Sequence, residues 1–343
     1  MLSKLTNSEI TISNISKTDK IELGIFYKKI FPSRYKNLIN NWKWWYRNNL
    51  NDKEPIILLN KKKVIGQAAF ISSKVEVNNK KINTIWFQDY AVLPEYTGKG
   101  YGKLLCSEWM KICPDQMAIC SPFSLRVLKK FNWKENYDTK RFVKPINFTK
   151  FLPLIRNYDN KFLNNLFKNF IRFKDKKSDI KIYKMTKNFD ILEDAFSNRV
   201  ENFKENYINI VRDEDWLKWR LLDCPYKDDI FFFQYKNNFT IVHLYKSGNT
   251  KRLNIMYSFY TDTSQEAEIL MLIINWSIQN NVDFVWIISC DNELKKYFTN
   301  FLTKPLRLAT WSQNKKNFNL FKNGISNLQG IDSDIESGMY IDK

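Results

Sequence analysis

The sequence predicts an α+β chain with mixed α/β sheets, divided into two parts of similar size. At 343 residues it is long for one domain, and two domains of about 170 residues each are expected for this length. Hydrophobic residues make up 44% of the chain and aromatic residues 16%, which is enough for packed cores and argues against disorder. Strand-like runs alternate with helical runs, an order typical of sheets covered by helices.

Runs of β-branched and aromatic residues separated by polar turns predict the strands of the first half. They are expected at Glu9–Ile15, Pro55–Leu59, Val64–Ser72, Lys74–Val77, Ile82–Leu93 and Gln116–Cys120. Helical runs lie between them, at Thr18–Ile30, around Trp42–Tyr46, at Tyr101–Ile112 and at Ser124–Phe131.

The second half repeats this order at a constant offset. Trp219 follows Trp45 by 174 positions, and Ile230 follows Ile56 by the same number. The repeated elements are an aromatic helix, two strands, a long helix and a further strand, at Trp216–Arg220, Ile230–Tyr235, Phe239–Tyr245, Ser264–Gln279 and Phe284–Ser289. This pattern favours a degenerate duplication over coincidence.

The net charge of +19 raises the question of a nucleic-acid partner. The sequence has 11 arginines against 44 lysines, whereas readout of phosphates and bases favours the bidentate guanidinium. The lysines are also spread along its whole length. We therefore expect a solvated basic surface that could gather polyanionic ligands, and no nucleic-acid partner.

Cysteine and histidine usage argues against metal chemistry. The five cysteines form no C-x-x-C pair, and His243 is the single histidine, in a strand-like run where a core role is expected. We expect no metal site and reduced, mostly buried thiols. The longest apolar stretch falls short of a membrane span, and the first residues lack an export signal, so we expect a cytoplasmic protein.

A glycine-rich segment lies between strand Ile82–Leu93 and helix Tyr101–Ile112. Gly98, Gly100 and Gly102 let the backbone turn tightly and bring bare N–H groups to an anion, at the positive end of the helix dipole. A pyrophosphate suits such a site. A P-loop is excluded because Leu104 follows Gly102-Lys103, and the Rossmann spacing is not met. A plain glycine turn is the alternative.

The stretch from Pro94 to Leu105 resembles the acyl-CoA signature of the GNAT acetyltransferase superfamily, [QR]-x-x-G-x-[GA]. Gly100 and Gly102 match the small positions, and Thr97 replaces the usual Gln or Arg. Ser124–Trp133 resembles the end of the family's domain, where a Ser-x-x-x-Tyr-x-x-x-Gly-Phe motif is usual. Leu128 replaces its tyrosine, and Asn132 replaces its glycine, which asparagine tolerates because it accepts positive φ. The resemblance covers about Glu9 to Asn147.

The resemblance implies a GNAT fold with acetyl-CoA as co-substrate and no metal. The strand before the loop would bind the pantetheine arm through its backbone near Val92, and the loop would hold the pyrophosphate, with Lys99 and Lys103 adding charge at the rim. The implied coenzyme-binding residues are Ala91, Val92, Thr97, Gly98, Lys99, Gly100, Tyr101, Gly102 and Lys103.

The reaction would transfer an acyl group directly to an amine, which must lose a proton. Asp89 is the first candidate for the base, the alternative being a carboxylate that anchors the acceptor. Glu95 is a second candidate, although a solvated position is favoured. Tyr90 and Tyr137 are candidate proton donors to the leaving thiolate, and core packing is the alternative for both.

We expect residues 1–148 to form the catalytic domain, 149–180 a basic linker, and 181–343 a degenerate GNAT-like domain that completes the acceptor cleft. Tyr260–Ser264 stands where the glycine loop would repeat, so the second half should bind no coenzyme. The tail Gln329–Asp334 is expected to be a surface turn, an acceptor contact being the alternative.

The two-part layout resembles GNAT-like enzymes of surface-polysaccharide pathways, which implies a small-molecule amine acceptor, an amino sugar or a nucleotide-linked amino sugar. Two alternatives stay open. One is a FemABX-like aminoacyl or peptidyl transferase that uses aminoacyl-tRNA, and the other is a non-enzymatic module that binds nucleic acid or glycan.

Overall fold

The computed structural model describes residues 9–46, 53–147, 180–197, 207–260, 263–291, 294, 298, 304–329 and 332. The chain divides into two compact units, and neither is continuous in sequence. Unit 1 comprises residues 1–138, 203–212 and 306–326, and unit 2 comprises 139–202, 213–305 and 327–343. Each contains its own mixed sheet, so the predicted α+β class with two units is confirmed.

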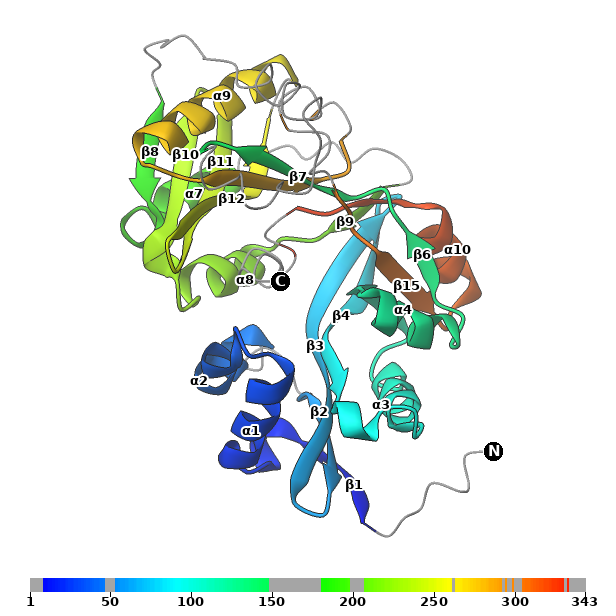
Figure 1. Cartoon of the computed structure of the whole chain (residues 1–343). Helices are drawn as coiled ribbons and strands as arrows, with labels where there is room; N and C mark the ends of the chain where they lie inside the picture. Colours follow the sequence, from blue (N-terminus) through cyan, green and yellow to red (C-terminus); the bar gives the residue numbers. More distant parts are fainter. Residues whose placement is uncertain are drawn as a thin grey trace, which may run out of the picture. The chain divides into compact units, whose positions relative to one another are not determined.

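The sheet of unit 1 has the order β1-β2-β3-β4-β5-β15-β6, with β9 paired to β3 and β16 paired to β9 (Figure 1). All neighbours along this order are antiparallel except β4 and β5, which run parallel. The strands are β1 (Ile10–Asn14), β2 (Ile56–Asn60), β3 (Lys63–Val77), β4 (Lys80–Val92), β5 (Asp115–Ile119), β6 (Lys134–Asn136), β9 (Tyr207–Ile210), β15 (Leu308–Ser312) and β16 (Ile325–Asn327).

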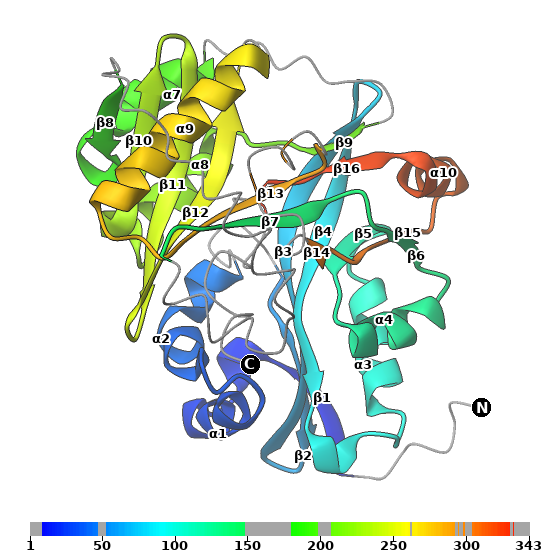
Figure 2. The same cartoon turned by 45° about the horizontal axis from the view of Figure 1, so that its top comes forward.

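Helices cover both faces of this sheet. In both views α1 (Lys20–Ile30) and α2 (Tyr35–Trp45) lie on one side of β2–β4, and α3 (Tyr101–Met110) and α4 (Pro122–Lys129) lie on the other (Figures 1 and 2). The short helices η1 (Ile15–Lys17) and η3 (Pro94–Tyr96) precede α1 and α3, and α10 (Lys315–Asn323) follows β15. Helix α1 begins where the Asp19 side chain accepts hydrogen bonds from the amides of Ile21 and Glu22.

The sheet of unit 2 has the order β14-β7-β13-β12-β11-β10-β8. Its strands are β7 (Lys140–Pro145), β8 (Lys181–Lys184), β10 (Ile230–Tyr235), β11 (Asn238–Ser247), β12 (Thr250–Phe259), β13 (Phe284–Ser289) and β14 (Lys304–Pro305). Its helices are α7 (Phe189–Ser197), α8 (Glu214–Leu217) and α9 (Thr263–Gln279), with the short η4 (Met185–Lys187), η5 (Lys218–Leu222) and η6 (Lys227–Asp229). Helix α9 buries Ile269, Leu270 and Ile273 in the core of one sheet face.

Each sheet contains a strand from the other half of the sequence. β7, which ends the first half, pairs antiparallel with β13, and β15 of the second half pairs with both β5 and β6. The units therefore differ from the ranges 1–148 and 181–343 expected from the sequence, because local patterns give no information on which sheet a strand joins. Of the expected linker, residues 149–179 lie outside the described residues.

The internal repeat extends to the detail of the strand registers. In unit 1 Gln67 pairs with Ala91, and in unit 2 Ile241 pairs with Tyr257. The strand register is irregular just before Ala91 in β4 and just before Tyr257 in β12. Gln67 and Ile241 are again 174 positions apart. The predicted duplication is thus matched by two strand pairs that bend at equivalent points.

Most expected elements of the first half are present, with two differences. The runs Val64–Ser72 and Lys74–Val77 form one strand, β3, because Ser73 is buried and continues the ladder opposite Thr84. The aromatic helix expected around Trp42–Tyr46 is present as the last turn of α2, which begins earlier, at Tyr35, and is kinked at Asn41 (φ −126°). The elements of the second half that were not expected are β8, α7, β9, β12, β14, β15, α10 and β16.

Candidate active site

Strands β4 and β5 separate partway along their length. They pair in parallel from Ile85 to Phe87, whereas β4 continues to Val92 and, within the described ranges, forms no further ladder with β5. A β-bulge lies at this point: Gln88 pairs with Ala69, and Ala91 pairs with Gln67. A bulge bends its strand and twists it away from a neighbour, which accounts for the opening.

The end of β4 directs its backbone groups into this opening. Leu93 N–H donates to Ile65 C=O at 2.8 Å, so these two residues form a hydrogen-bonded pair of the antiparallel ladder. In such a ladder the next pair, Val92 and Gly66, points its N–H and C=O groups outward. Val92 therefore offers a donor and an acceptor on the side away from β3, where an extended amide-bearing ligand could bind.

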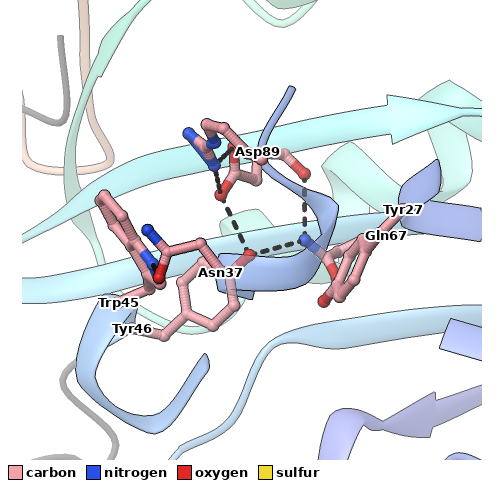
Figure 3. Close-up of polar contacts among 7 residues, drawn as sticks. Tyr27, Asn37, Trp45, Tyr46, Gln67 and Asp89 are labelled. Carbon is pink, nitrogen blue, oxygen red and sulfur yellow. Dashed lines mark hydrogen bonds and ion pairs between the residues drawn. The ribbon is translucent and has the colours of Figure 1, made fainter. Parts of the chain in front are cut away.

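Asp89 lies in the bulge with φ 45°, and its carboxylate points toward Tyr46, the residue that follows α2 (Figure 3). Arg34 Nη2 lies 2.8 Å from both carboxylate oxygens, and the Tyr46 hydroxyl donates to Oδ2 at 3.0 Å. The side chains of Asp89 and Arg34 are only 2% and 6% exposed. A buried carboxylate needs such partners, because an unpaired one would be strongly destabilising.

Gln67 extends this network along β3. Its Nε2 donates to the Tyr46 hydroxyl at 3.0 Å and to the backbone C=O of Asp89 at 3.4 Å, and its Oε1 accepts from the Tyr27 hydroxyl at 2.6 Å. Burial, and then the charge of Asp89, raise the pKa values of Tyr27 and Tyr46. Both phenols therefore remain protonated, and the network holds the bulge through its side chain and its backbone.

The glycine loop presents a run of backbone donors. Gly98 and Gly100 have φ values of 77° and 86°, a region that favours glycine, and Gly100 is the N-cap of α3. The first amide bonded within the helix is that of Leu104, which donates to Gly100 C=O at 3.0 Å. Among the described residues, the N–H groups of Gly98 to Lys103 have no protein acceptor, and residues 97–100 are exposed. An anion would find free donors here.

Two contacts fix the loop against β4. The Tyr90 hydroxyl donates to Gly102 C=O at 2.6 Å, and a Cβ on Gly102 would lie 2.6 Å from that hydroxyl. Glycine at 102 is therefore required by the approach of Tyr90. The Thr97 hydroxyl donates to Pro94 C=O at 2.7 Å, and the buried ring of Tyr101 packs beside Tyr96, so Tyr101 offers a ligand its amide and not its side chain.

The structure thus brings together the predicted residues of β4 and α3, which are Asp89, Tyr90, Ala91, Val92, Thr97, Gly98, Lys99, Gly100, Tyr101, Gly102 and Lys103. Lys99 Nζ lies 5.2 Å from the centre of the Tyr96 ring. Tyr137 lies apart from them in sequence, after β6, where it is 46% exposed and donates to Glu135.

The remaining candidates have clear surroundings. Glu95 is bound by Lys29 at 2.9 Å and Lys63 at 3.4 Å, and the hydrogen bond from Lys29 is the first cause that lowers the pKa of Glu95 to about 2. Leu128 is fully buried, and Asn132 has φ 64°, as expected for a residue in place of glycine. His243 is buried and stacks on Tyr226 at 4.3 Å between ring centres.

Metal-binding and membrane-spanning features are absent from the described part of the chain. It contains no group of three or more His, Cys, Asp or Glu side chains able to hold a metal ion. Within the same ranges, no helix has the length and apolarity that crossing a membrane requires. The five cysteines, all within these ranges, form no disulfide.

Sequence reasoning missed the partners of Asp89, namely Arg34, Tyr46 and Gln67. One signal could have indicated them: Gln67 is the single polar residue in the run from Val64 to Phe70, and a buried polar residue needs partners. Arg34 carried no such signal, because it lies in a polar turn between two helices.

Residues 24–135 match the family model described as an acetyltransferase (GNAT) domain. No curated protein matches the chain in sequence.

Solved structures share the fold over most of the chain. A GCN5-related N-acetyltransferase from Anabaena variabilis aligns with TM-score 0.58 and 12% identity over 88% of this chain and 72% of that one. The corresponding protein from Kribbella flavida gives 0.57 and 9%, over 88% and 70%. Saccharomyces cerevisiae N-myristoyltransferase, solved with bound myristoyl-CoA and inhibitors, gives 0.60 and 11%, over 94% and 86%. The chain therefore has a GNAT fold in two units, and its residues 24–135 are similar to the acetyltransferase domain of that family.

Proposed function

We propose that the chain is an acyl-CoA-dependent N-acyltransferase that moves an acetyl group from acetyl-CoA to a primary amine. One observation carries the proposal. The six consecutive amides from Gly98 to Lys103 have no protein acceptor among the described residues. They lead into α3 and follow, after the short η3, the strand whose Val92 points its N–H and C=O outward. A pyrophosphate and the amides of a pantetheine arm need these two sets of groups in this order.

The reaction would proceed without a covalent enzyme intermediate. The amine nitrogen forms a bond to the thioester carbon, the carbon–sulfur bond breaks, the nitrogen loses a proton and the thiolate gains one. The protein's part is to hold the thioester at the opening between β4 and β5, where orientation alone can supply much of the rate.

The contacts of Asp89 favour a positioning role over the base expected from the sequence. Both of its oxygens are bound by Arg34, Oδ2 also accepts from Tyr46, and the side chain is only 2% exposed, which leaves almost no surface for an incoming amine. Tyr90 similarly uses its proton on Gly102 C=O, and burial raises its pKa. We assign both residues to the support of the bulge and loop. Tyr137 remains the candidate donor because its side chain is exposed, and its hydroxyl donates to Glu135.

For the acceptor we propose an amino sugar or a nucleotide-linked amino sugar. The resemblance of the two-part layout supports this class, and the net charge of +19 would attract a phosphate-bearing acceptor. An intact glycine loop argues against the aminoacyl-tRNA alternative, since that donor carries no coenzyme pyrophosphate.

A matched pair of glycine variants tests the proposal. Gly98 (φ 77°) and Gly248 (φ 51°) both have positive φ, and an added Cβ would meet nothing within 4 Å at either site. Gly98→Ala and Gly248→Ala should each lose about 1 kcal/mol of stability from the strained conformation. Only Gly98→Ala should weaken acetyl-CoA binding in isothermal titration calorimetry.

Equal acetyl-CoA affinity in both variants would contradict the loop assignment. The wild-type protein is the first control, because acetyl-CoA should raise its melting temperature. If acetyl-CoA has no effect and RNA is instead retained in a salt-sensitive manner, the nucleic-acid alternatives are favoured.

A further inference from the structure

Unit 2 repeats the strand opening of unit 1, and the protein itself fills it. β12 and β13 pair in parallel from Arg252 to Ile255, after which β12 continues to Phe259 and, in the part of the chain that the structure describes, forms no further ladder with β13. In β12 Ser258 pairs with Thr240, as Val92 of β4 pairs with Gly66, and Gly66 and Thr240 are 174 positions apart. Ser258 is therefore the counterpart of Val92.

Both backbone polar groups of Ser258 are bound by one side chain. Ser258 N–H donates to Gln329 Oε1 at 2.8 Å, and Gln329 Nε2 donates to Ser258 C=O at the longer distance of 3.4 Å. A carboxamide thus bonds a donor and an acceptor of the same residue. An amide of an extended ligand would make this pair of contacts at a strand edge.

Two hydrogen bonds join Gln329 to Asp332. Gln329 N–H donates to Asp332 Oδ2 at 2.9 Å, and Asp332 N–H donates back to Gln329 C=O at 3.0 Å. Leu328 and Asp332 are buried, with 1% and 4% of their surface exposed. Of the segment Gln329–Asp334, which was expected to be a surface turn, the described residues are the half-buried Gln329 and the buried Asp332.

We propose that the edge of β12 at Ser258 is a carboxamide-binding site, the counterpart of the coenzyme site, and that Gln329 of the same chain occupies it as an internal ligand. The site explains how unit 2 keeps an open strand pair without a coenzyme, since Gln329 satisfies polar groups that would otherwise need one. The comparison with Val92 rests on the proposed function, whereas the assignment of Gln329 to Ser258 does not.

Hydrogen exchange of the full-length protein, resolved at single amides by NMR, tests the inference. Without coenzyme the Ser258 amide should be protected and the Val92 amide should exchange freely. Gln329→Leu removes both contacts at similar volume and should speed exchange at Ser258 about tenfold, the value of one hydrogen bond. Gln279→Leu is the control, because Gln279 is exposed at the end of α9 in the same unit.

The outcomes separate the two proposals. If the Ser258 amide exchanges as fast in the wild type as in Gln329→Leu, the internal ligand is refuted. If the variant does not fold, fast exchange of the Ser258 amide in the wild type is by itself enough to refute it. Acetyl-CoA should protect Val92 and leave Ser258 unchanged in wild type. If acetyl-CoA does not protect the Val92 amide while the Ser258 amide is protected, only the proposed function is contradicted.

Discussion

Arg34 and Asp89, 55 positions apart in the sequence, form a buried ion pair in which one guanidinium nitrogen lies 2.8 Å from each carboxylate oxygen. The pair joins the turn before α2 to the bulge of β4. Asp89 has a φ of 45°, which a non-glycine residue adopts only when its surroundings impose it. The ion pair therefore stabilises the irregular backbone on which the opening between β4 and β5 depends.

Removing either member of this ion pair should destabilise the folded protein. Arg34→Met and Asp89→Asn each leave a buried partner without its contacts, and each should lower the free energy of unfolding by about 3 kcal/mol. The double variant should lose less than the sum, because it leaves no buried charge. Urea unfolding of the four proteins gives the coupling energy.

An exposed ion pair provides the control for this cycle. Lys29 and Glu95 lie 2.9 Å apart on the surface, where solvent screens their attraction. Lys29→Met and Glu95→Gln should leave the unfolding curve nearly unchanged. Coupling as weak for Arg34 and Asp89 as for this pair would show that the buried ion pair does not stabilise the bulge.

The pH dependence of turnover distinguishes a base from a positioning residue. If Asp89 positions the strand, Asp89→Asn lowers turnover and acetyl-CoA affinity by a constant factor from about pH 5 to 9. A base at this position would instead remove the acidic limb of the pH–rate profile. Glu95→Gln should leave the profile unchanged above about pH 4, because Glu95 has a pKa of about 2 and is already ionised there.

The contact between Tyr90 and Gly102 predicts a compensating pair of substitutions. Gly102→Ala places a Cβ 2.6 Å from the Tyr90 hydroxyl and should cost about 1–3 kcal/mol through overpacking. In a Tyr90→Phe background the nearest ring carbon lies 3.7 Å away, an ordinary contact, so the same alanine should cost little. Thermal unfolding of the single and double variants checks this, and an equal cost in both backgrounds would refute the steric assignment.

The single histidine gives a pH prediction for unit 2. Burial, followed by the charges of Arg252 and Arg220, lowers the pKa of His243 to about 3. The unfolded chain binds this proton below about pH 6.5 and the folded protein does not, so stability falls as pH drops from about 6.5 to about 3. The NMR signal of His243 should show no titration above about pH 4.

His243→Phe keeps the stacking on Tyr226 and removes the titrating group. Between about pH 4 and 6 its stability should depend on pH less steeply than that of the wild type, by about 1.4 kcal/mol per pH unit at most. A His243 signal that titrates near its ordinary pKa of about 6.5 would mean that the ring reaches solvent.

The sequence predicted the parts of the site that depend on local chemistry. The glycine loop, the strand before it and the positive φ of Asn132 all follow from residue types in order along the sequence. The partners of Asp89 could not be predicted, because they depend on how β3 and α2 pack. The bulge was equally hidden, because β4 is buried at every position from Thr84 to Gln88 and so shows no alternation there that one extra residue could interrupt.

The exchange of β7 and β15 has a consequence for how the protein is made. Because β15 stands between β5 and β6, the first sheet stays incomplete until residue 312 has left the ribosome. An N-terminal fragment that ends before β13 would lack β15, an inner strand of the first sheet, and its β7 would have no partner strand. Fragments cut between residues 149 and 179 should accordingly be poor folders when alone and should recover structure when mixed, each supplying the strand that the other needs.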